Sequence, residues 1–155
     1  MRLRRRDDPS LEAVTYRPIG HVRSAPRRAP AGGWRDVESS IVIEDEFGAG
    51  LAGIEEYGHV WVVLALHGVA EEERRLLRRS PPGAPGEVGV FALRTQMRPN
   101  PIGISAVRLL AVEGTTLRVR GLDAIDGTSV LDIKPYIPYY DSVPDASVPD
   151  WIGHP

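Results

Sequence analysis

The chain has 155 residues, of which 42% are hydrophobic, so it is long enough for one domain with a sizeable core and too short for two domains of ordinary size. Its formal net charge of −2 argues against a protein that holds nucleic acid mainly through an overall positive charge, and leaves room only for a local basic face. It contains no cysteine, which excludes disulfide bonds, thiolate nucleophiles and thiolate metal ligands.

The start of the chain shows no targeting pattern. The basic residues 1–6 run into Asp7, Asp8 and Pro9 without a hydrophobic stretch, and no apolar run approaches the ~20 residues of a membrane helix. We therefore expect a cytoplasmic protein with no membrane partner. The composition also predicts a flexible segment over residues 1–14, a folded domain over residues 15–143, and a proline-rich C-terminal tail over residues 144–155.

Most of the chain shows the pattern of short β-strands. Apolar and polar residues alternate or form short apolar blocks, and turns containing Gly or Pro separate them. The run over residues 60–66 is apolar at every position, so we expect it to be buried on both faces. The pattern predicts an all-β, mainly antiparallel fold with strands over residues 16–23, 39–44, 60–66, 91–94, 102–112, 116–120 and 130–133.

A glycine pattern over residues 48–53 matches the G-x-G-x-x-G signature of dinucleotide-binding proteins. That signature works only between a strand and a long helix, because the phosphate binds at the amino terminus of the helix. Here Gly58 and the apolar run follow almost at once, which leaves no room for a helix. We interpret the segment as a glycine-rich turn.

The only segment with a helical pattern covers residues 69–79. Three glutamates stand at its start and four arginines toward its end, an order that complements the helix dipole, and Pro81 and Pro82 end it. The sequence therefore predicts one short helix beside the strands, and its charges are interpreted as a solvated face.

The run Arg98-Pro99-Asn100-Pro101 gives the clearest indication of a ligand site. Each proline fixes its own φ and pushes the residue before it toward extended geometry. Arg98 and Asn100 are therefore presented from a stiff segment that leads directly into an apolar strand. The alternative interpretation is a proline-rich connection with no function beyond entry into that strand.

Several blocks together resemble one known family. They are residues 17–20 (RPIG), 51–67, 89–105 with the motif PNPIG, 122–128 (LDAIDGT) and 130–136 (VLDIKPY). In these blocks the chain resembles the TsaA-like, or TrmO, family of S-adenosylmethionine-dependent methyltransferases. The resemblance implies a compact antiparallel β-barrel that binds S-adenosylmethionine near a homodimer interface. It also implies N-methylation of threonylcarbamoyl-adenosine beside the tRNA anticodon.

The resemblance also implies a set of residues that contact the cofactor. These are Ala31, Gly32, Gly33, Leu66, His67, Arg94, Ile104, Gly121, Leu122 and Asp123. Arg94 suits the cofactor carboxylate, and Asp123 suits its ammonium or hydroxyl groups. His67 has an alternative interpretation as a structural histidine at the end of an apolar strand.

Further residues are candidates for the reaction itself, and no metal is expected. Methyl transfer depends mainly on alignment, but a base can assist because the expected acceptor nitrogen is conjugated and carries a proton. The candidates for catalysis are Asp126, Lys134 and Tyr136. The candidates for substrate binding are Arg98, Asn100, Asp132 and Asp141. The alternatives are an ordinary Asp-Gly turn at Asp126 and a strand end with a surface charge at Lys134.

Two features leave the acceptor open. The chain has Leu93, Gln96 and Met97 where many relatives differ, and its slight negative charge would restrict a tRNA to local arginines such as Arg118 and Arg120. Three hypotheses therefore stand: a tRNA adenosine methyltransferase, the same barrel acting on a small metabolite, and a non-catalytic ligand-binding barrel.

Overall fold

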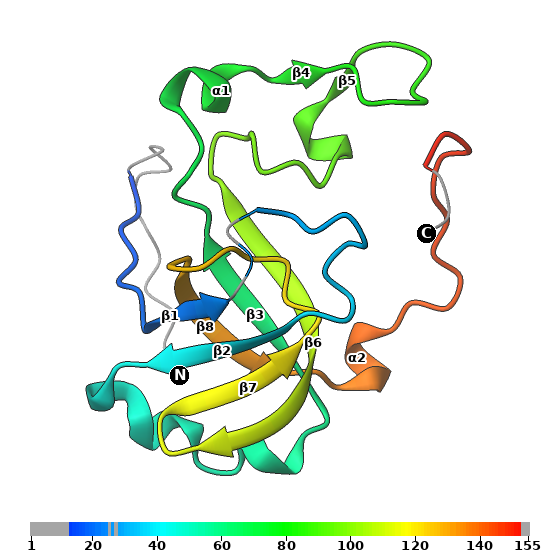
Figure 1. Cartoon of the computed structure of the whole chain (residues 1–155). Coiled ribbons are helices and arrows are strands. Elements are labelled where there is room, and N and C mark those ends of the chain that lie inside the picture. Colours follow the sequence, from blue (N-terminus) through cyan, green and yellow to red (C-terminus); the bar gives the residue numbers. More distant parts are fainter. Residues whose placement is uncertain (1–12, 25, 27, 153–155) are drawn as a thin grey trace, which may run out of the picture.

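The computed structural model describes residues 13–24, 26 and 28–152. Six strands close into an antiparallel barrel in the order β1-β2-β7-β6-β3-β8, which confirms the predicted all-β barrel (Figure 1). The strands are β1 (Gly20–Ser24), β2 (Glu38–Ile43), β3 (His59–Ala65), β6 (Ile102–Glu113), β7 (Thr116–Arg120) and β8 (Ser129–Pro135). The predicted first strand starts too early, because regular pairing begins only at Gly20.

The barrel interior is filled by alternate residues of each strand. In β7, Leu117 and Val119 are fully buried while Arg118 between them is exposed, as the sequence pattern predicts. Neighbouring strands contribute Ile41 and Val107 to the same core. This packing leaves little room inside the barrel, so ligand sites are expected at its ends or on its outer face.

Strand β3 differs from the expectation that it is buried on both faces. Val60, Val62 and Leu64 point inward and are completely buried, whereas the residues between them are only half-buried. A closed barrel of one layer has a single interior face, so an apolar strand places its second face outside. Trp61 on that outer face packs against the ring of Tyr136, with 5.6 Å between ring centroids.

The glycine pattern over residues 48–53 lies in the connection from β2 to β3. This connection forms two short 3₁₀ helices, η1 (Asp45–Leu51) and η2 (Ile54–Glu56), instead of a simple turn. Gly53 between them has a φ of 87°, a left-handed conformation that favours glycine. No long helix follows, in agreement with the rejection of a dinucleotide site.

The segment between β3 and β6 extends beyond the barrel (Figure 1). It contains α1 (Glu71–Arg75), a two-stranded sheet of β4 (Arg78–Arg79) and β5 (Val88–Gly89), and the 3₁₀ helix η3 (Val90–Ala92). The helix predicted over residues 69–79 is therefore too long. The observed helix α1 buries no residue, so no packing of an apolar face stabilises further helical turns. The strand predicted over residues 91–94 is wrong.

The chain ends in a short helix and an irregular tail. Helix α2 (Pro138–Asp141) follows β8, and residues 142–152 contain no helix or strand. A Cβ built on Gly83 would lie 3.2 Å from the carbonyl oxygen of Trp151, so the tail returns to the loop between β4 and β5. Of the expected flexible segment 1–14, residues 1–12 lie outside the described residues. No helix in residues 13–24, 26 and 28–152 combines the length and apolarity needed to cross a bilayer.

Candidate functional site

Three loops lie at the same end of the barrel because of the directions of the strands that they connect. We call this end of the barrel the mouth. Because neighbouring strands are antiparallel, β1, β3 and β7 end at the mouth, and β2, β6 and β8 begin there. The loops 25–37, 66–101 and 121–128 therefore meet around one opening. Backbone hydrogen bonds fix them to the barrel: the Leu66 N–H donates to Pro101 at 2.8 Å, and the Gly121 N–H donates to Val37 at 3.0 Å.

The largest cavity of the mouth, of about 830 Å³, is lined by side chains from all three loops; we call it the mouth cavity. This volume falls in the range of ordinary small-molecule sites. Five residues from the predicted cofactor set line it: Leu66, Arg94, Ile104, Gly121 and Asp123. Apolar side chains, a guanidinium and a carboxylate therefore border one space. Sequence reasoning missed Arg35 and Ser105, which also line the mouth cavity, and so does Gln96, which the sequence marked only as a departure from the family pattern.

Two arginines of the 90–98 segment have different roles in this geometry. The Arg94 side chain is exposed and donates one hydrogen bond, 3.0 Å long, to the Ile104 carbonyl. Arg98 is half-buried, and its Nη2 donates to the carbonyls of Val90 and Leu93, both at 2.9 Å. Arg98 therefore holds its own loop together, whereas Arg94 has unused donors at the rim of the mouth cavity.

A second cavity, of about 300 Å³, continues from the mouth cavity, with which it shares Leu66, Gln96 and Asp123; we call it the side cavity. His67 lines it together with Trp34, another residue that sequence reasoning missed. The predicted residues Ala31, Gly32 and Gly33 lie in the same loop as Trp34 but line none of the cavities described here.

Gly121 and Leu122 show why the 121–128 loop is well defined. Gly121 has a φ of 90°, a left-handed conformation that favours glycine, and this sets the turn at which the loop leaves β7. Leu122 is fully buried and belongs to the barrel core. Its side chain is therefore unavailable to a ligand, and only its backbone can serve the predicted contact.

A third cavity, of about 690 Å³, lies on the outside of the mouth and is bounded by residues 13–16 and the ends of β3 and β6; we call it the outer groove. Asn100 lines this groove, together with Leu66 and His67, which also border the other cavities. Tyr16 forms part of the opposite wall. Its adjacency to the proline-rich motif could not be read from the sequence, because more than eighty residues separate the two segments.

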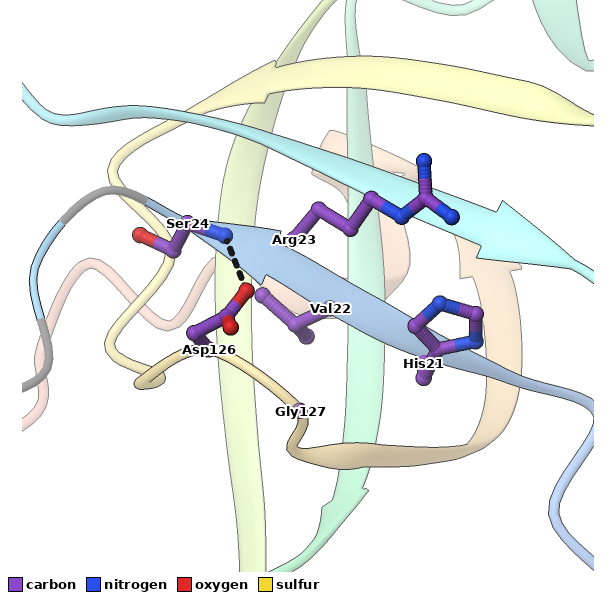
Figure 2. Close-up of a pocket in the computed structure, with 6 residues that line it drawn as sticks. All are labelled: His21, Val22, Arg23, Ser24, Asp126 and Gly127. Atoms are coloured by element: carbon purple, nitrogen blue, oxygen red, sulfur yellow. Dashed lines mark hydrogen bonds between the residues drawn. The ribbon is translucent and has the colours of Figure 1, made fainter.

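Asp126, a predicted catalytic residue, faces a separate, shallow pocket of about 480 Å³ (Figure 2). Its Oδ1 accepts a hydrogen bond of 3.1 Å from the Ser24 N–H, which ties the 126–127 turn to the end of β1. His21 and Arg23 line the same pocket. The contact matches the turn interpretation of Asp126.

The remaining predicted residues lie away from the mouth. Lys134 pairs with Trp61 in the register of β8 and β3, and the Tyr136 N–H donates to His59, so both are near the start of β3. The carboxylate of Asp132 lies 2.8 Å from Lys134 Nζ and raises the pKa of this exposed lysine, first by hydrogen bonding and then by charge attraction.

Asp141 also lies at the far end. Its Oδ2 accepts a hydrogen bond of 2.6 Å from the N–H of Ile137, the residue before α2, a contact like the return half of a capping box. Within one chain, Lys134, Tyr136 and Asp141 therefore do not meet the mouth residues. Among the described residues no cluster of three or more His, Asp or Glu side chains could hold a metal ion.

Comparison with known proteins identifies the family. The family model for the tRNA-methyltransferase O N-terminal domain matches residues 17–142, which include all six barrel strands and the three mouth loops. The chain belongs to this family. Recognition of the TsaA-like, or TrmO, pattern in the sequence is thereby confirmed.

Individual TrmO-like proteins support the assignment. A probable S-adenosyl-L-methionine-binding protein of Pyrococcus abyssi is 41% identical over 133 residues, which cover 83% of this chain and 71% of that protein. The tRNA (adenine(37)-N6)-methyltransferase of Escherichia coli strain K12 is 43% identical over 100 residues, which cover 61% of this chain and 43% of that enzyme.

The crystal structure of TrmO from Pseudomonas aeruginosa superimposes with a TM-score of 0.72 and 35% sequence identity, and covers 89% of this chain. The chain spans 62% of that structure, so it corresponds to one part of the longer protein. This chain and that TrmO structure therefore share the β-barrel fold.

Proposed function

We propose that the chain is an S-adenosylmethionine-dependent methyltransferase of the TrmO family and that the mouth cavity binds the cofactor. The observation that carries this proposal is the meeting of Leu66, Arg94, Ile104 and Asp123 around one cavity. These residues come from distant parts of the sequence, and relatives with the same domain are named S-adenosyl-L-methionine-binding proteins.

The chemistry of the lining fits this cofactor. Arg94 provides free donors for a carboxylate, and Asp123 provides an acceptor for an ammonium or a ribose hydroxyl. Leu66 and Ile104 supply apolar surface for an adenine ring. Gly121 lets the backbone approach closely, because it has no side chain in the way.

The protein's own contribution to the reaction is alignment and exclusion of water. When bound, S-adenosylmethionine supplies an electrophilic methyl group on a sulfonium that leaves as a neutral thioether. The chain must hold the acceptor nitrogen in line with that methyl group, since orientation is the largest gain in such a displacement. In this proposal His67, which lines both the side cavity and the outer groove, accepts the proton of the acceptor nitrogen.

We propose a tRNA adenine as the acceptor, in the threonylcarbamoyl form that the family resemblance implies, and hence a cytoplasmic location. The named activity of the Escherichia coli relative supports the adenine. The charge distribution around the mouth supports the nucleic acid. Arg28 and Arg35, which line the side cavity and the mouth cavity, form no salt bridge with any described carboxylate.

The arginines suggested from the sequence are less suited to phosphate binding. Arg118 and Arg120 both contact the carboxylate of Glu38, at 3.5 and 2.6 Å, and lower its pKa; the Arg120 hydrogen bond is the largest cause. Their charge is therefore partly neutralised within β2 and β7. A phosphate backbone would contact the arginines around the mouth instead.

A homodimer with the site near its interface is also part of the proposal. The outer face of β3 and β6 carries Trp61, Val63, Ile104 and Ala106 in neighbouring register positions. Ile104 is 49% exposed and also lines the mouth cavity, so a second copy on this face would border the cofactor site. Asp132 and Lys134 flank the face with both signs of charge, which suits a self-complementary contact.

The test combines cofactor binding with analysis of the product. The purified chain is titrated calorimetrically with S-adenosylmethionine and then incubated with cofactor and tRNA from cells that lack this methylation. We expect saturable binding and a methylated adenosine, detected by mass spectrometry of the nucleosides. Cofactor binding without RNA methylation would overturn the tRNA acceptor in favour of a small molecule, and absence of binding would overturn the enzyme assignment.

A further inference from the structure

The outer groove has no assigned role so far, although it adjoins both cavities of the mouth. It shares Leu66 and Ile102 with the mouth cavity, and Leu66 and His67 with the side cavity. Its other wall is formed by Ala13, Val14 and Tyr16, in the segment that leads down to β1 and is shown in dark blue in Figure 1. The outer groove and the mouth cavity are therefore adjoining spaces.

The lining of the outer groove combines apolar surface with few polar groups. Tyr16 is 66% exposed and so offers its ring to the groove, and Val14, Pro101 and Ile102 add further apolar surface. Asn100 supplies an amide with both donor and acceptor atoms. This composition suits a flat heteroaromatic ring that stacks on one side and forms hydrogen bonds at one edge.

Asn100 is held firmly in relation to the mouth. Prolines on both sides restrict its backbone, and its carbonyl accepts a hydrogen bond of 2.7 Å from the Ile102 N–H. The next residue, Pro101, accepts the Leu66 N–H at 2.8 Å. The Asn100 side chain makes no hydrogen bond with the described residues, so its amide is available to a ligand.

Arg74 adds a positive group to the same groove. Its Nε donates to the Val69 carbonyl at 3.1 Å, and its two terminal nitrogens form no hydrogen bond or salt bridge with a described residue. The side chain is half-buried, so this one bond orients the guanidinium. A carboxylate in the groove would find a bidentate partner there.

We infer that the outer groove binds the acceptor adenine, with Tyr16 stacking on the base and Asn100 pairing with its edge. Arg74 binds the carboxylate of the threonylcarbamoyl substituent. This inference rests on the proposed function and names the residues that select its substrate. The groove shares Leu66 with the mouth cavity and His67 with the side cavity, so an acceptor bound in it lies beside the donor, as methyl transfer requires.

The first test compares Tyr16→Ala with Tyr16→Phe, and Asn100→Ala with the wild type, on a threonylcarbamoylated anticodon stem-loop. We expect Tyr16→Ala and Asn100→Ala each to raise the KM for the RNA tenfold or more, which equals about 1.4 kcal/mol, while Tyr16→Phe stays within threefold. The Kd for S-adenosylmethionine should stay within twofold for all three. Tyr57→Ala, an exposed aromatic residue at the far end of the barrel, is the control and should leave both constants unchanged.

A second arm tests Arg74 with modified and unmodified stem-loops. Arg74→Gln should remove most of the preference for the modified RNA and leave cofactor affinity unchanged. If the wild type is active and Tyr16→Ala and Asn100→Ala keep their RNA KM, or lose cofactor affinity in parallel, the inference fails while the proposed function stands. An inactive wild type would refute the proposed function and this inference with it.

Discussion

Replacement of Arg98 by alanine distinguishes a structural arginine from a ligand-binding one. The sequence suggests that Arg98 is presented to a ligand, but its Nη2 donates to the carbonyls of Val90 and Leu93, each at 2.9 Å. Its Nε is buried without a hydrogen-bond partner in the described structure. The guanidinium therefore closes the loop that carries Arg94, and its removal should affect stability first.

The magnitude follows from these two contacts. A hydrogen bond that involves a charged group contributes about 1.5–3 kcal/mol, and water can replace part of each lost bond at this half-buried position. We expect Arg98→Ala to lower the free energy of unfolding by about 2–3 kcal/mol. For a domain of this length each kcal/mol corresponds to about 2–4 °C, so Tm should fall by roughly 4–12 °C.

Thermal unfolding followed by circular dichroism measures this effect, with Arg94→Ala as the matched control. Arg94 is exposed and makes a single hydrogen bond, so its variant should unfold within about 2 °C of the wild type. The Tm of Arg98→Lys should lie between those of the wild type and Arg98→Ala, because a single ammonium group replaces the planar guanidinium and its several donors. A wild-type Tm for Arg98→Ala, together with weaker RNA binding, would show that Arg98 serves the ligand instead.

Two further predictions concern charges on the barrel. Arg94→Ala should weaken S-adenosylmethionine binding by about 1.5–3 kcal/mol in calorimetry, because it removes the expected carboxylate partner; an unchanged Kd would exclude Arg94 from that role. Glu38→Gln should destabilise the fold at neutral pH, since the Arg120 hydrogen bond lowers the folded-state pKa of Glu38 below its ordinary value of 4.5. That contribution is present above the ordinary pKa and is lost as the pH falls through the folded-state pKa. Urea unfolding of both proteins should therefore converge in acid, and a difference that persists there would contradict the assignment.

The strands were predictable where alternation and turn chemistry agree. The strand over residues 116–120 is confirmed at both ends, because Leu117 and Val119 alternate with polar residues and Gly114 begins the hairpin turn with a φ of 60°. The second half of β3 was harder to interpret. The residues on its outer face are apolar as well. A sequence pattern cannot distinguish an apolar face inside the barrel from an apolar face outside it.

The segment between β3 and β6 shows the limit of local rules. Charge order along residues 71–79 favours a helix, but Arg79 donates instead to the Glu73 carbonyl at 2.9 Å and its backbone pairs with Val88. Long-range pairing therefore replaces the second half of the predicted helix. Similarly, Val90 begins the 3₁₀ helix η3, and the Arg98 side chain stabilises this turn by donating hydrogen bonds to the carbonyls of Val90 and Leu93.

For the site, strand direction decides which predicted residues can act together. Leu66 follows β3 and Ile104 is near the start of β6, so an antiparallel barrel places both at the mouth. By the same rule Lys134, near the end of β8, lies at the other end. The predicted strands alone did not show this, because the wrong strand over residues 91–94 would reverse the direction assigned to β6. Within one chain, Leu66 and Ile104 therefore border one cavity, and Lys134 lies away from it.

The outer groove follows a different logic, because neither motif nor strand order predicts it. It exists because the chain before β1 runs beside β8, where the Ile19 N–H donates to the Val130 carbonyl at 2.8 Å and fixes the path of the segment. Tyr16 and Asn100 thereby line the same groove although they are distant in the sequence. A methyltransferase needs two adjoining sites of different chemistry, and this chain provides a charged mouth cavity and a largely apolar outer groove, which share Leu66 and Ile102.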